Sequence, residues 1–243
     1  MVEQALLTNP GGRENNEDYV IMTEYGEEKC FVLCDGLGGH ECGEVASSSV
    51  AEFVAGLFRK SGDYPAFIDD AFSLAQAMLL ELQTQKGMMN AMKTTMVILV
   101  VTPELIKWGH IGDSRLYHIY NNGMNYERTK DHSLVQLLVD MGEISEEQMR
   151  SHSDRNKLLR VMGSEWGNKS YDKSGVLERD GSSHAFALMT DGFWEYVHEN
   201  EMMTLQNQSG SCGEWLENME KLILERADMS RTDNYSAICV RVQ

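Results

Sequence analysis

Four aspartates in this chain share one local pattern, since each borders an apolar segment and stands beside glycine or asparagine. They are Asp35, Asp113, Asp191 and Asp233, and the adjacent pair Glu17-Asp18 adds two further carboxylates. Hard oxygen ligands with few histidines or cysteines favour Mg²⁺ or Mn²⁺ over Zn²⁺. If these side chains converge, cations must lie among them, because like charges at close range otherwise force protonation.

Such a set of carboxylates is suited to phosphoryl chemistry. Two metals about 4 Å apart, bridged by a carboxylate, can turn a bound water into a nucleophile and hold a phosphoryl group in line. Arg13 could bind two non-bridging phosphate oxygens in a bidentate manner. The alternative is that the four aspartates are unrelated turn residues, and the spacing alone leaves both interpretations open.

The segment around Asp35 shows how the chain would position such a group. Phe31 to Cys34 is predicted to be a short buried strand, and Asp35 follows it at the start of the glycine-rich run 36–40. Glycines let the backbone come close to a ligand. A helix is expected over 43–59, with apolar residues on one face.

Other apolar patterns predict the elements that would carry the remaining aspartates. A second amphipathic helix is expected over 67–82, and a third includes Leu216, Met219 and Ile223. Strands are expected at 19–23, 95–101, 108–111, 116–120, 186–190 and 235–242. The run 95–101 is apolar without interruption, which indicates a strand covered by a second sheet on one face and by helices on the other.

The strands at 108–111 and 116–120 are interpreted as part of a β-meander, with Asp113 at their junction. Residues 129–163 differ from the rest of the chain, because two short helical patterns stand there beside the polar run 151–156. We interpret this segment as a small inserted flap rather than a second core domain. Ser145 with Glu146 and Glu147 is expected to begin its second helix.

Composition limits the classes of protein that fit. The 243 residues are 42% hydrophobic, enough for one sizeable core, so a single domain spanning 1–243 is expected. The net charge of −17 disfavours nucleic acid and anionic membranes as partners. No apolar run approaches 18 residues and no secretory signal is visible. Five cysteines without a Cys-x-x-Cys pair predict reduced thiols in a cytoplasmic protein, without a zinc site.

In combination, six sequence blocks resemble the metal-dependent Ser/Thr protein phosphatases of the PP2C type (the PPM family), in their compact bacterial form. They occur in family order along nearly the whole chain. The blocks are 13–18 (RENNED), 35–40 (DGLGGH) with Gly43-Glu44, 112–115 (GDSR), 131–133 (DHS), 190–194 (TDGFW) and Asp233-Asn234.

The resemblance implies an α+β fold: a four-layer α-β-β-α sandwich of two central antiparallel sheets flanked by helix pairs, with a small flap at about 129–160. It implies hydrolysis of phosphoserine and phosphothreonine by a metal-activated water, without a covalent phosphoenzyme. Two Mn²⁺ or Mg²⁺ ions are expected, with a third in bacterial members. The expected partners are phosphorylated proteins, the substrates of a Ser/Thr kinase, and the expected state is a monomer.

The resemblance also assigns roles to positions of this chain. Asp35 matches the carboxylate that bridges two metals, with the Gly36 carbonyl and Glu17 on one of them. Asp191 and Asp233 match ligands of the other metal, and Asp18 is similar to a residue that holds metal-bound water. The remaining assignments are Asp113 with Asp191 at a third metal, Arg13 at the phosphate, and Asn234 orienting Asp233 or a water.

Two departures from the family pattern concern the leaving group and the arginine. Members with Asp-Gly-His at the first glycine block use that histidine as a general acid, whereas this chain has Leu37 there. His40, His132 through a water, or metal-bound water are the alternatives. The segment from Thr8 to Arg13 is one residue shorter than usual, which affects the direction in which Arg13 points.

Three rival interpretations were weighed. A PP2C-fold regulatory or binding module with little activity would be expected to lack metal ligands, and every expected carboxylate is present here. The run 112–116 approaches a serine-hydrolase elbow, but Leu116 replaces the closing glycine. Residues 36–41 miss the dinucleotide fingerprint, because Glu41 stands where the last glycine belongs.

Overall fold

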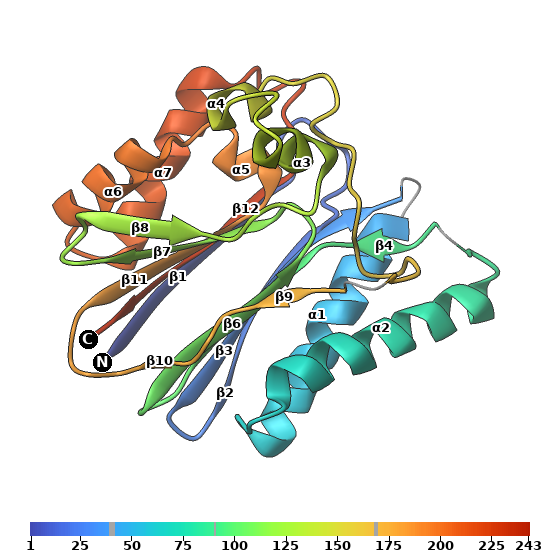
Figure 1. Cartoon of the computed structure of the whole chain (residues 1–243), viewed down its shortest axis with the longest axis horizontal. Coiled ribbons are helices and arrows are strands. Elements are labelled where there is room, and N and C mark those ends of the chain that lie inside the picture. The colour runs from blue at the N-terminus through green and yellow to red at the C-terminus, as the bar shows by residue number, and fades with distance from the viewer. Residues whose placement is uncertain (39–41, 90, 168–169) are drawn as a thin grey trace.

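The molecule is built around two antiparallel sheets that pack face to face, as the computed structural model of residues 1–38, 42–89, 91–167 and 170–243 shows (Figure 1). In spatial order the first sheet contains β1 (Val2–Asn9), β12 (Tyr235–Val242), β11 (His184–Met189), β7 (Arg115–Tyr120) and β8 (Asn125–Arg128). The second contains β10 (Leu177–Glu178), β6 (Leu105–Ile111), β5 (Met96–Val101), β3 (Glu28–Leu37) and β2 (Asp18–Tyr25), with β4 (Lys93–Thr94) on β3 and β9 (Asp172–Lys173) on β6.

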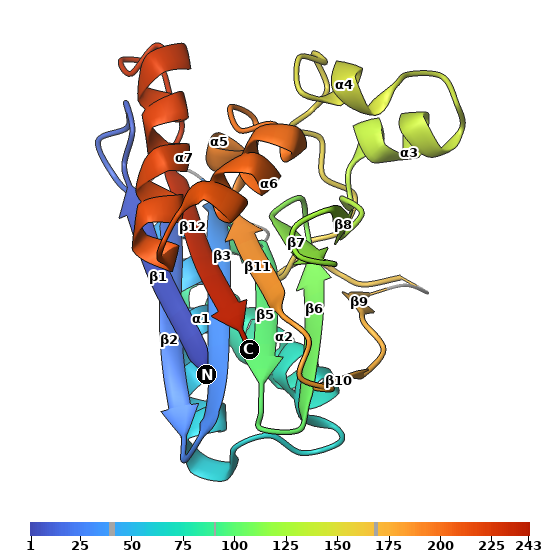
Figure 2. The ribbon, with the colours of Figure 1, turned by 90° about the vertical axis from the view of Figure 1, so that its left-hand side faces the viewer.

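Helix pairs cover the outer faces of both sheets, which confirms the four-layer sandwich (Figures 1 and 2). The second sheet carries α1 (Cys42–Ser61) and α2 (Phe67–Lys86), and the first carries α6 (Glu199–Gln208) and α7 (Cys212–Arg226). Three short helices complete the described structure: α3 (Leu134–Asp140), α4 (Glu146–Met149) and α5 (Asp191–Trp194). The segment with α3 and α4 stands off from the sandwich at the end where α5 lies (Figure 2).

The uninterrupted apolar strands are explained by burial on both faces. In β3, Phe31 and Leu33 point between the sheets, whereas Cys30, Val32 and Cys34 point toward α1 and α2. β5 divides its side chains in the same alternating way. Successive residues of a strand face opposite sides, so a strand with two covered faces needs apolar residues at every position.

The connection between β6 and β7 contradicts the predicted β-meander. β6 pairs with β5 in one sheet, whereas β7 pairs with β11 and β8 in the other. The chain therefore crosses between the sheets at residues 112–114. Gly112 permits this crossing, because its φ is +102° and a Cβ atom there would lie 2.5 Å from Thr95 Cγ2.

Two further differences concern strands. β1 was not predicted; its residues are mostly half-buried at a sheet edge, and they pair with β12 from Val2↔Val242 to Asn9↔Tyr235. β3 does not end at Cys34 but continues to Leu37, since Gly36 and Leu37 pair with Thr94 and Lys93. The helices expected at 43–59 and 67–82 are confirmed as α1 and α2.

Two composition-based expectations can be compared with the structure. None of the helices among the described residues is both long and apolar enough to cross a membrane. All five cysteines are free thiols in buried positions.

We expect the centre of the sandwich to dominate stability. Phe31 is completely buried between the sheets, so Phe31→Ala should lower the free energy of unfolding by about 3–5 kcal/mol. Leu74→Ala is the control: Leu74 is 45% exposed, and its truncation should change stability by no more than about 0.5 kcal/mol. Urea denaturation of both variants measures the difference, and equal effects would contradict this account of the core.

Candidate active site

The predicted carboxylates meet at the end of the sandwich opposite the chain termini. Strands β3, β6 and β11 end there, and β2, β7 and β12 begin there, so residues distant in sequence converge. A cavity of about 430 Å³ opens at this end. Its lining includes Arg13, Glu17, Asp35, Gly36, Leu37, Asp113, Asp191, Asp233 and Asn234.

Asp18 lies beneath the cavity rather than on its wall. It begins β2 directly opposite Asp35 of β3, and it is only 6% exposed. The Thr190 hydroxyl donates to Asp18 Oδ2 at 3.0 Å, whereas Asp18 Oδ1 is buried without a hydrogen-bond partner among the described residues. A buried carboxylate oxygen left without a donor is costly unless a cation or water satisfies it.

Thr95 holds the backbone of Asp35 and links it to the next aspartate. The Asp35 N–H donates to Thr95 Oγ1 at 2.9 Å, and the Thr95 N–H donates to the Asp35 carbonyl at 2.8 Å. The same hydroxyl lies 2.7 Å from Ser114 Oγ, beside Asp113. Ser114 is thus part of a buried hydroxyl pair, which disagrees with a nucleophilic serine.

Glu17 is fastened by its main chain, which leaves its side chain free to face the cavity. Gly36 N–H donates to the Glu17 carbonyl at 3.0 Å, and Ser47 Oγ donates to the same oxygen at 2.6 Å. Gly36 must be glycine, because a Cβ atom there would lie 2.2 Å from the Gly43 carbonyl oxygen at the start of α1.

Asn234 differs from its expected role. Its side-chain oxygen accepts from Glu17 N–H at 2.8 Å, and its amide donates to the carbonyls of Pro10 and Asn15 at 2.9 Å each. Only the backbone N–H of Asn234 contacts Asp233, at 2.9 Å from Oδ1. The Asn234 side chain therefore holds the loop that carries Glu17 and does not contact Asp233, whereas its expected alternative role of orienting a water stays a prediction.

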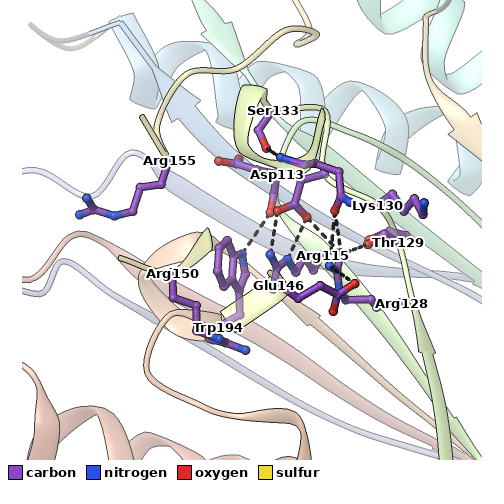
Figure 3. Close-up of polar contacts among 12 residues, drawn as sticks. Asp113, Arg115, Arg128, Thr129, Lys130, Ser133, Glu146, Arg150, Arg155 and Trp194 are labelled. Carbon is purple, nitrogen blue, oxygen red and sulfur yellow. Dashed lines mark hydrogen bonds and ion pairs between the residues drawn. The ribbon is translucent and has the colours of Figure 1, made fainter. Parts of the chain in front are cut away.

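Two groups support the turn that carries Asp113: Trp194 of α5 and a buried ion pair between Arg115 and Asp131 (Figure 3). Trp194 Nε1 donates to the Asp113 carbonyl at 3.1 Å. The Arg115 guanidinium lies 3.4 Å from the centre of the Trp194 ring and donates two hydrogen bonds to Asp131, at 2.8 and 2.7 Å. Arg115 and Asp131 are both almost fully buried, so this pair rigidly supports the turn around Asp113.

Arg13 reaches the rim of the cavity from the loop between β1 and β2. Its Nη2 donates to Asp233 Oδ2 at 2.9 Å, and both side chains are about half exposed. The guanidinium thus points at the carboxylates despite the shorter segment before it, and part of its surface remains available to a ligand.

Burial and mutual repulsion make the carboxylates hard to ionise together. Burial, followed by the charge of Asp18, raises the pKa of Asp35 well above its ordinary value. Burial and the charge of Asp191 do the same to the pKa of Asp113. Burial raises the pKa of Asp18 and of Asp191 to about 7, with Glu195 as the main additional charge beside Asp191.

These observations fit divalent cations bound among the carboxylates. The donor set consists of carboxylate oxygens and the Gly36 carbonyl, which are ligands typical of Mg²⁺ and Mn²⁺. Positive charge inside the cavity would offset the burial and the repulsion that raise these pKa values, and it would stand near the unpartnered oxygen of Asp18.

The structure narrows the set of residues that could act as the general acid. Leu37 lines the cavity, as the sequence implied. His40 lies outside the described residues. His132 does not line the cavity: its side chain is 1% exposed, and both ring nitrogens are hydrogen-bonded, to Gly112 N–H and to Asp172.

Sequence reasoning missed several residues that shape the site. Asn156 and Leu158 of the segment 129–160 line the cavity, although that segment was predicted only as a small flap. Thr95 was also missed; a threonine at the start of an uninterrupted apolar strand was its only signal. Trp194 belongs to one of the family blocks but was given no role there; it is buried, and its indole contacts Asp113.

Comparisons with known proteins agree with this geometry. The family model for protein phosphatase 2C matches residues 12–229. Serine/threonine phosphatase stp of Listeria welshimeri is 28% identical over 209 residues, 83% of this chain and 81% of the relative. PstP of Mycobacterium tuberculosis is 34% identical over 152 residues, 62% of this chain but only 29% of that protein.

The fold is also that of solved structures. The crystal structure of serine/threonine phosphatase Stp1 from Staphylococcus aureus superposes with a TM-score of 0.88. The match covers 100% of this chain and 96% of that one, at 28% identity.

We expect the raised carboxyl pKa values to shape stability in metal-free protein. The pKa of Asp18 is 3.8 in an ordinary setting and about 7 here, so the folded state binds its proton more tightly than the unfolded state. This contribution to stability is therefore complete below about pH 4 and is lost as the pH rises to about 7. In EDTA, Asp18→Asn should flatten that part of the profile of unfolding free energy against pH.

Asp140→Asn is the matched control, because Asp140 is exposed and its pKa is lowered by Lys130. An unchanged slope between pH 4 and 7 in Asp18→Asn would contradict the raised pKa of Asp18.

Proposed function

The chain belongs to the protein phosphatase 2C family, and we propose that it hydrolyses phosphoserine and phosphothreonine esters of proteins at the carboxylate-lined cavity. The single observation that carries this proposal is the convergence of Asp35, Asp113, Asp191 and Asp233 on one cavity with Arg13 at its rim. Carboxylates for cations beside a guanidinium for an oxyanion are the parts that phosphate ester hydrolysis requires.

We propose that Mn²⁺ or Mg²⁺ binds among these residues. Asp35 would bridge two ions, with Glu17 and the Gly36 carbonyl on one and with Asp191 and Asp233 on the other. Asp113 and Asp191 would hold a third ion, and Asp18 would act through bound water. The position of Asp18 supports this: it lies opposite Asp35 on the neighbouring strand, it is buried without lining the cavity, and its Oδ1 has no hydrogen-bond partner among the described residues, so a bound water would satisfy it.

The bound ions would supply the activation of the attacking water and neutralise charge on the phosphoryl oxygens. The chain itself orients the reactants. Arg13 presents two N–H groups in a fixed fork to the non-bridging phosphate oxygens. The hydrogen bonds around Thr95, Asn234 and Ser47 hold the carboxylates in place before substrate arrives, so little reorganisation is needed.

The surroundings of the site suggest how a protein substrate is presented. We propose that the whole chain works as one domain with the segment 129–160 as a flap, because Asn156 and Leu158 form part of the cavity wall. Arg155 of this flap binds the residue directly after α5, since its Nε donates to Glu195 at 2.8 Å. The flap would then contact the substrate residues on either side of the phosphorylated side chain.

We also propose partners and a location for the protein, which the family, the charge and the cysteines support. The proposed substrates are proteins phosphorylated by a Ser/Thr kinase, and the protein is proposed to act as a monomer. A net charge of −17 disfavours nucleic acid as a partner. Five free, buried cysteines are typical of a reducing compartment, which supports a cytoplasmic location.

The first test is phosphate release from a phosphothreonine peptide with Mn²⁺ or with EDTA. Wild type should be active only with metal. Asp191→Asn keeps the size of the side chain but removes a ligand charge, so activity should fall by more than about 100-fold. A folded wild type that binds Mn²⁺ but hydrolyses no phosphopeptide would favour a regulatory module, and a phosphorylated side chain trapped during turnover would contradict the direct attack of water.

A second test addresses Arg13. Arg13→Lys retains the charge but loses the planar fork, so KM for the phosphopeptide should rise by about tenfold with a smaller change in kcat. Arg59→Lys, at an exposed position on α1, is the control and should behave as wild type. An Arg13→Lys enzyme with unchanged kinetics would remove Arg13 from the phosphate site.

A further inference from the structure

The segment 131–133, Asp-His-Ser, lies beside the turn that carries Asp113. Asp131 supports that turn through Arg115, but His132 has no role in the function proposed so far. Asp131 binds Arg115, and Ser133 begins α3 by accepting from Gln136 N–H. Between them, His132 is 3% exposed and contacts Gly112, the residue immediately before Asp113. A buried histidine beside a cavity residue raises the question of what it holds.

His132 and Gly112 bind each other reciprocally. The His132 backbone N–H donates to the Gly112 carbonyl at 2.8 Å, and the Gly112 N–H donates to His132 Nδ1 at 3.2 Å. Both polar groups of Gly112 are therefore satisfied by one residue. Because Gly112 has a φ of +102° that few other residues adopt, the orientation of its peptide groups depends on such external contacts.

The hydrogen bond from Gly112 determines where the proton of His132 resides. Nδ1 accepts, so the ring proton must be on Nε2, and Nε2 donates to Asp172 Oδ2 at 2.9 Å. Burial lowers the pKa of His132 to about 4, so the ring is neutral near pH 7. Asp172 lies on β9, beside His110 of β6, and its side chain is 54% exposed.

A metal site is the competing explanation for this group. His110, His132 and Asp172 can each offer a ligand atom, all within 4.8 Å of one another. However, a metal on His132 Nε2 would require a ring that has lost both protons, since Nδ1 already accepts from Gly112. His110 Nε2 is 2.8 Å from the Lys130 carbonyl, and Arg160 contacts the same Asp172 oxygen at 3.4 Å. The geometry favours a chain of hydrogen bonds.

We propose that Asp172 and His132 are positioning residues for Asp113, a role that rests on the proposed function of the cavity. Asp172 fixes the ring orientation and tautomer of His132, and His132 fixes the peptide of Gly112. Trp194 holds the carbonyl of Asp113 from the other side. Hydrogen bonds therefore hold the backbone on both sides of the Asp113 side chain, and this orients its carboxylate toward the cavity.

The test compares His132→Leu, which removes both hydrogen bonds of the ring, with His132→Asn, whose Oδ1 replaces Nδ1 as the acceptor. His118→Leu is the matched control. His118 is also buried, at 5% exposure, and its Nδ1 lies 2.9 Å from a carboxylate oxygen of Glu127, but its other ring nitrogen lies 2.9 Å from His184 Nδ1 and not beside Gly112. His118→Leu loses a buried histidine–carboxylate pair but no contact with Gly112, whereas His132→Leu loses both, so the comparison separates the two effects.

Two readouts in metal-free protein do not depend on activity. Nitrogen-15 NMR of wild type should show His132 protonated on Nε2, and Asp172→Ala should diminish that preference. Amide exchange at Gly112 should accelerate at least tenfold in His132→Leu, return close to the wild-type rate in His132→Asn, and stay unchanged in His118→Leu.

Metal binding tests the consequence for Asp113. Calorimetric titration with Mn²⁺ should show affinity about 10–100-fold weaker in His132→Leu, with most of the loss recovered in His132→Asn. If His132→Leu does not fold, Asp172→Ala replaces it in the comparison and should also bind Mn²⁺ more weakly than wild type. Equal effects of His132→Leu and His118→Leu, or Mn²⁺ affinity unchanged in both His132→Leu and Asp172→Ala, would overturn the proposal.

The outcomes also separate this inference from the proposed function. If no phosphopeptide is hydrolysed although Gly112 exchange and Mn²⁺ affinity respond as expected, the positioning chain stands and the function fails. Tight binding of Zn²⁺ that is lost equally in His110→Ala and His132→Asn would instead support the metal site and overturn the hydrogen-bond chain.

Discussion

Repulsion among buried carboxylates is the constraint on which the rest of this structure depends. Asp18 and Asp35 face each other across adjacent strands, and Asp113 and Asp191 face the same cavity. Burial, together with this repulsion, raises their pKa values. A protein that keeps such groups close must hold each backbone firmly, because free side chains would separate.

The sandwich supplies that restraint by bringing strand ends from both sheets to one edge. The hydroxyls of Thr95 and Ser114 link the second sheet to the crossing between the sheets. Asn234 ties the start of β12 to the loop before β2 through three hydrogen bonds. These contacts are made by uncharged groups, so they orient the carboxylates without neutralising the charge that binds cations.

Three arginines connect the surroundings of the cavity to the segment 129–160. Arg115 lies between Asp131 and the Trp194 ring, and Arg150 of the flap contacts both Trp194 and Glu199. Arg155 donates a hydrogen bond to Glu195, and the charge of Glu195 contributes to the raised pKa of Asp191. Trp194 of α5 therefore contacts both Asp113 and Arg150 of the segment 129–160 (Figure 3). Glu195, directly after α5, and Glu199 of α6 bind Arg155 and Arg150 of the same segment.

The sequence by itself determined most of the core elements and the chemistry of the ligands. Uninterrupted apolar runs such as 95–101 indicated doubly covered strands, and aspartates beside glycine indicated hard-cation ligands, because these signals are local and depend on periodicity and side-chain type. The ordered blocks of the family resemblance then indicated which carboxylates belong together.

Only the tertiary structure decided how these parts meet. The crossing of the chain between sheets at Gly112, the pairing of β1 with β12, the action of Asn234 on the loop of Glu17 and the tautomer of His132 all depend on partners distant in sequence. Periodicity shows which face of a strand is buried, but it does not show which strand lies beside it. For that reason the types of the site residues could be predicted, whereas the contacts that aim them could not.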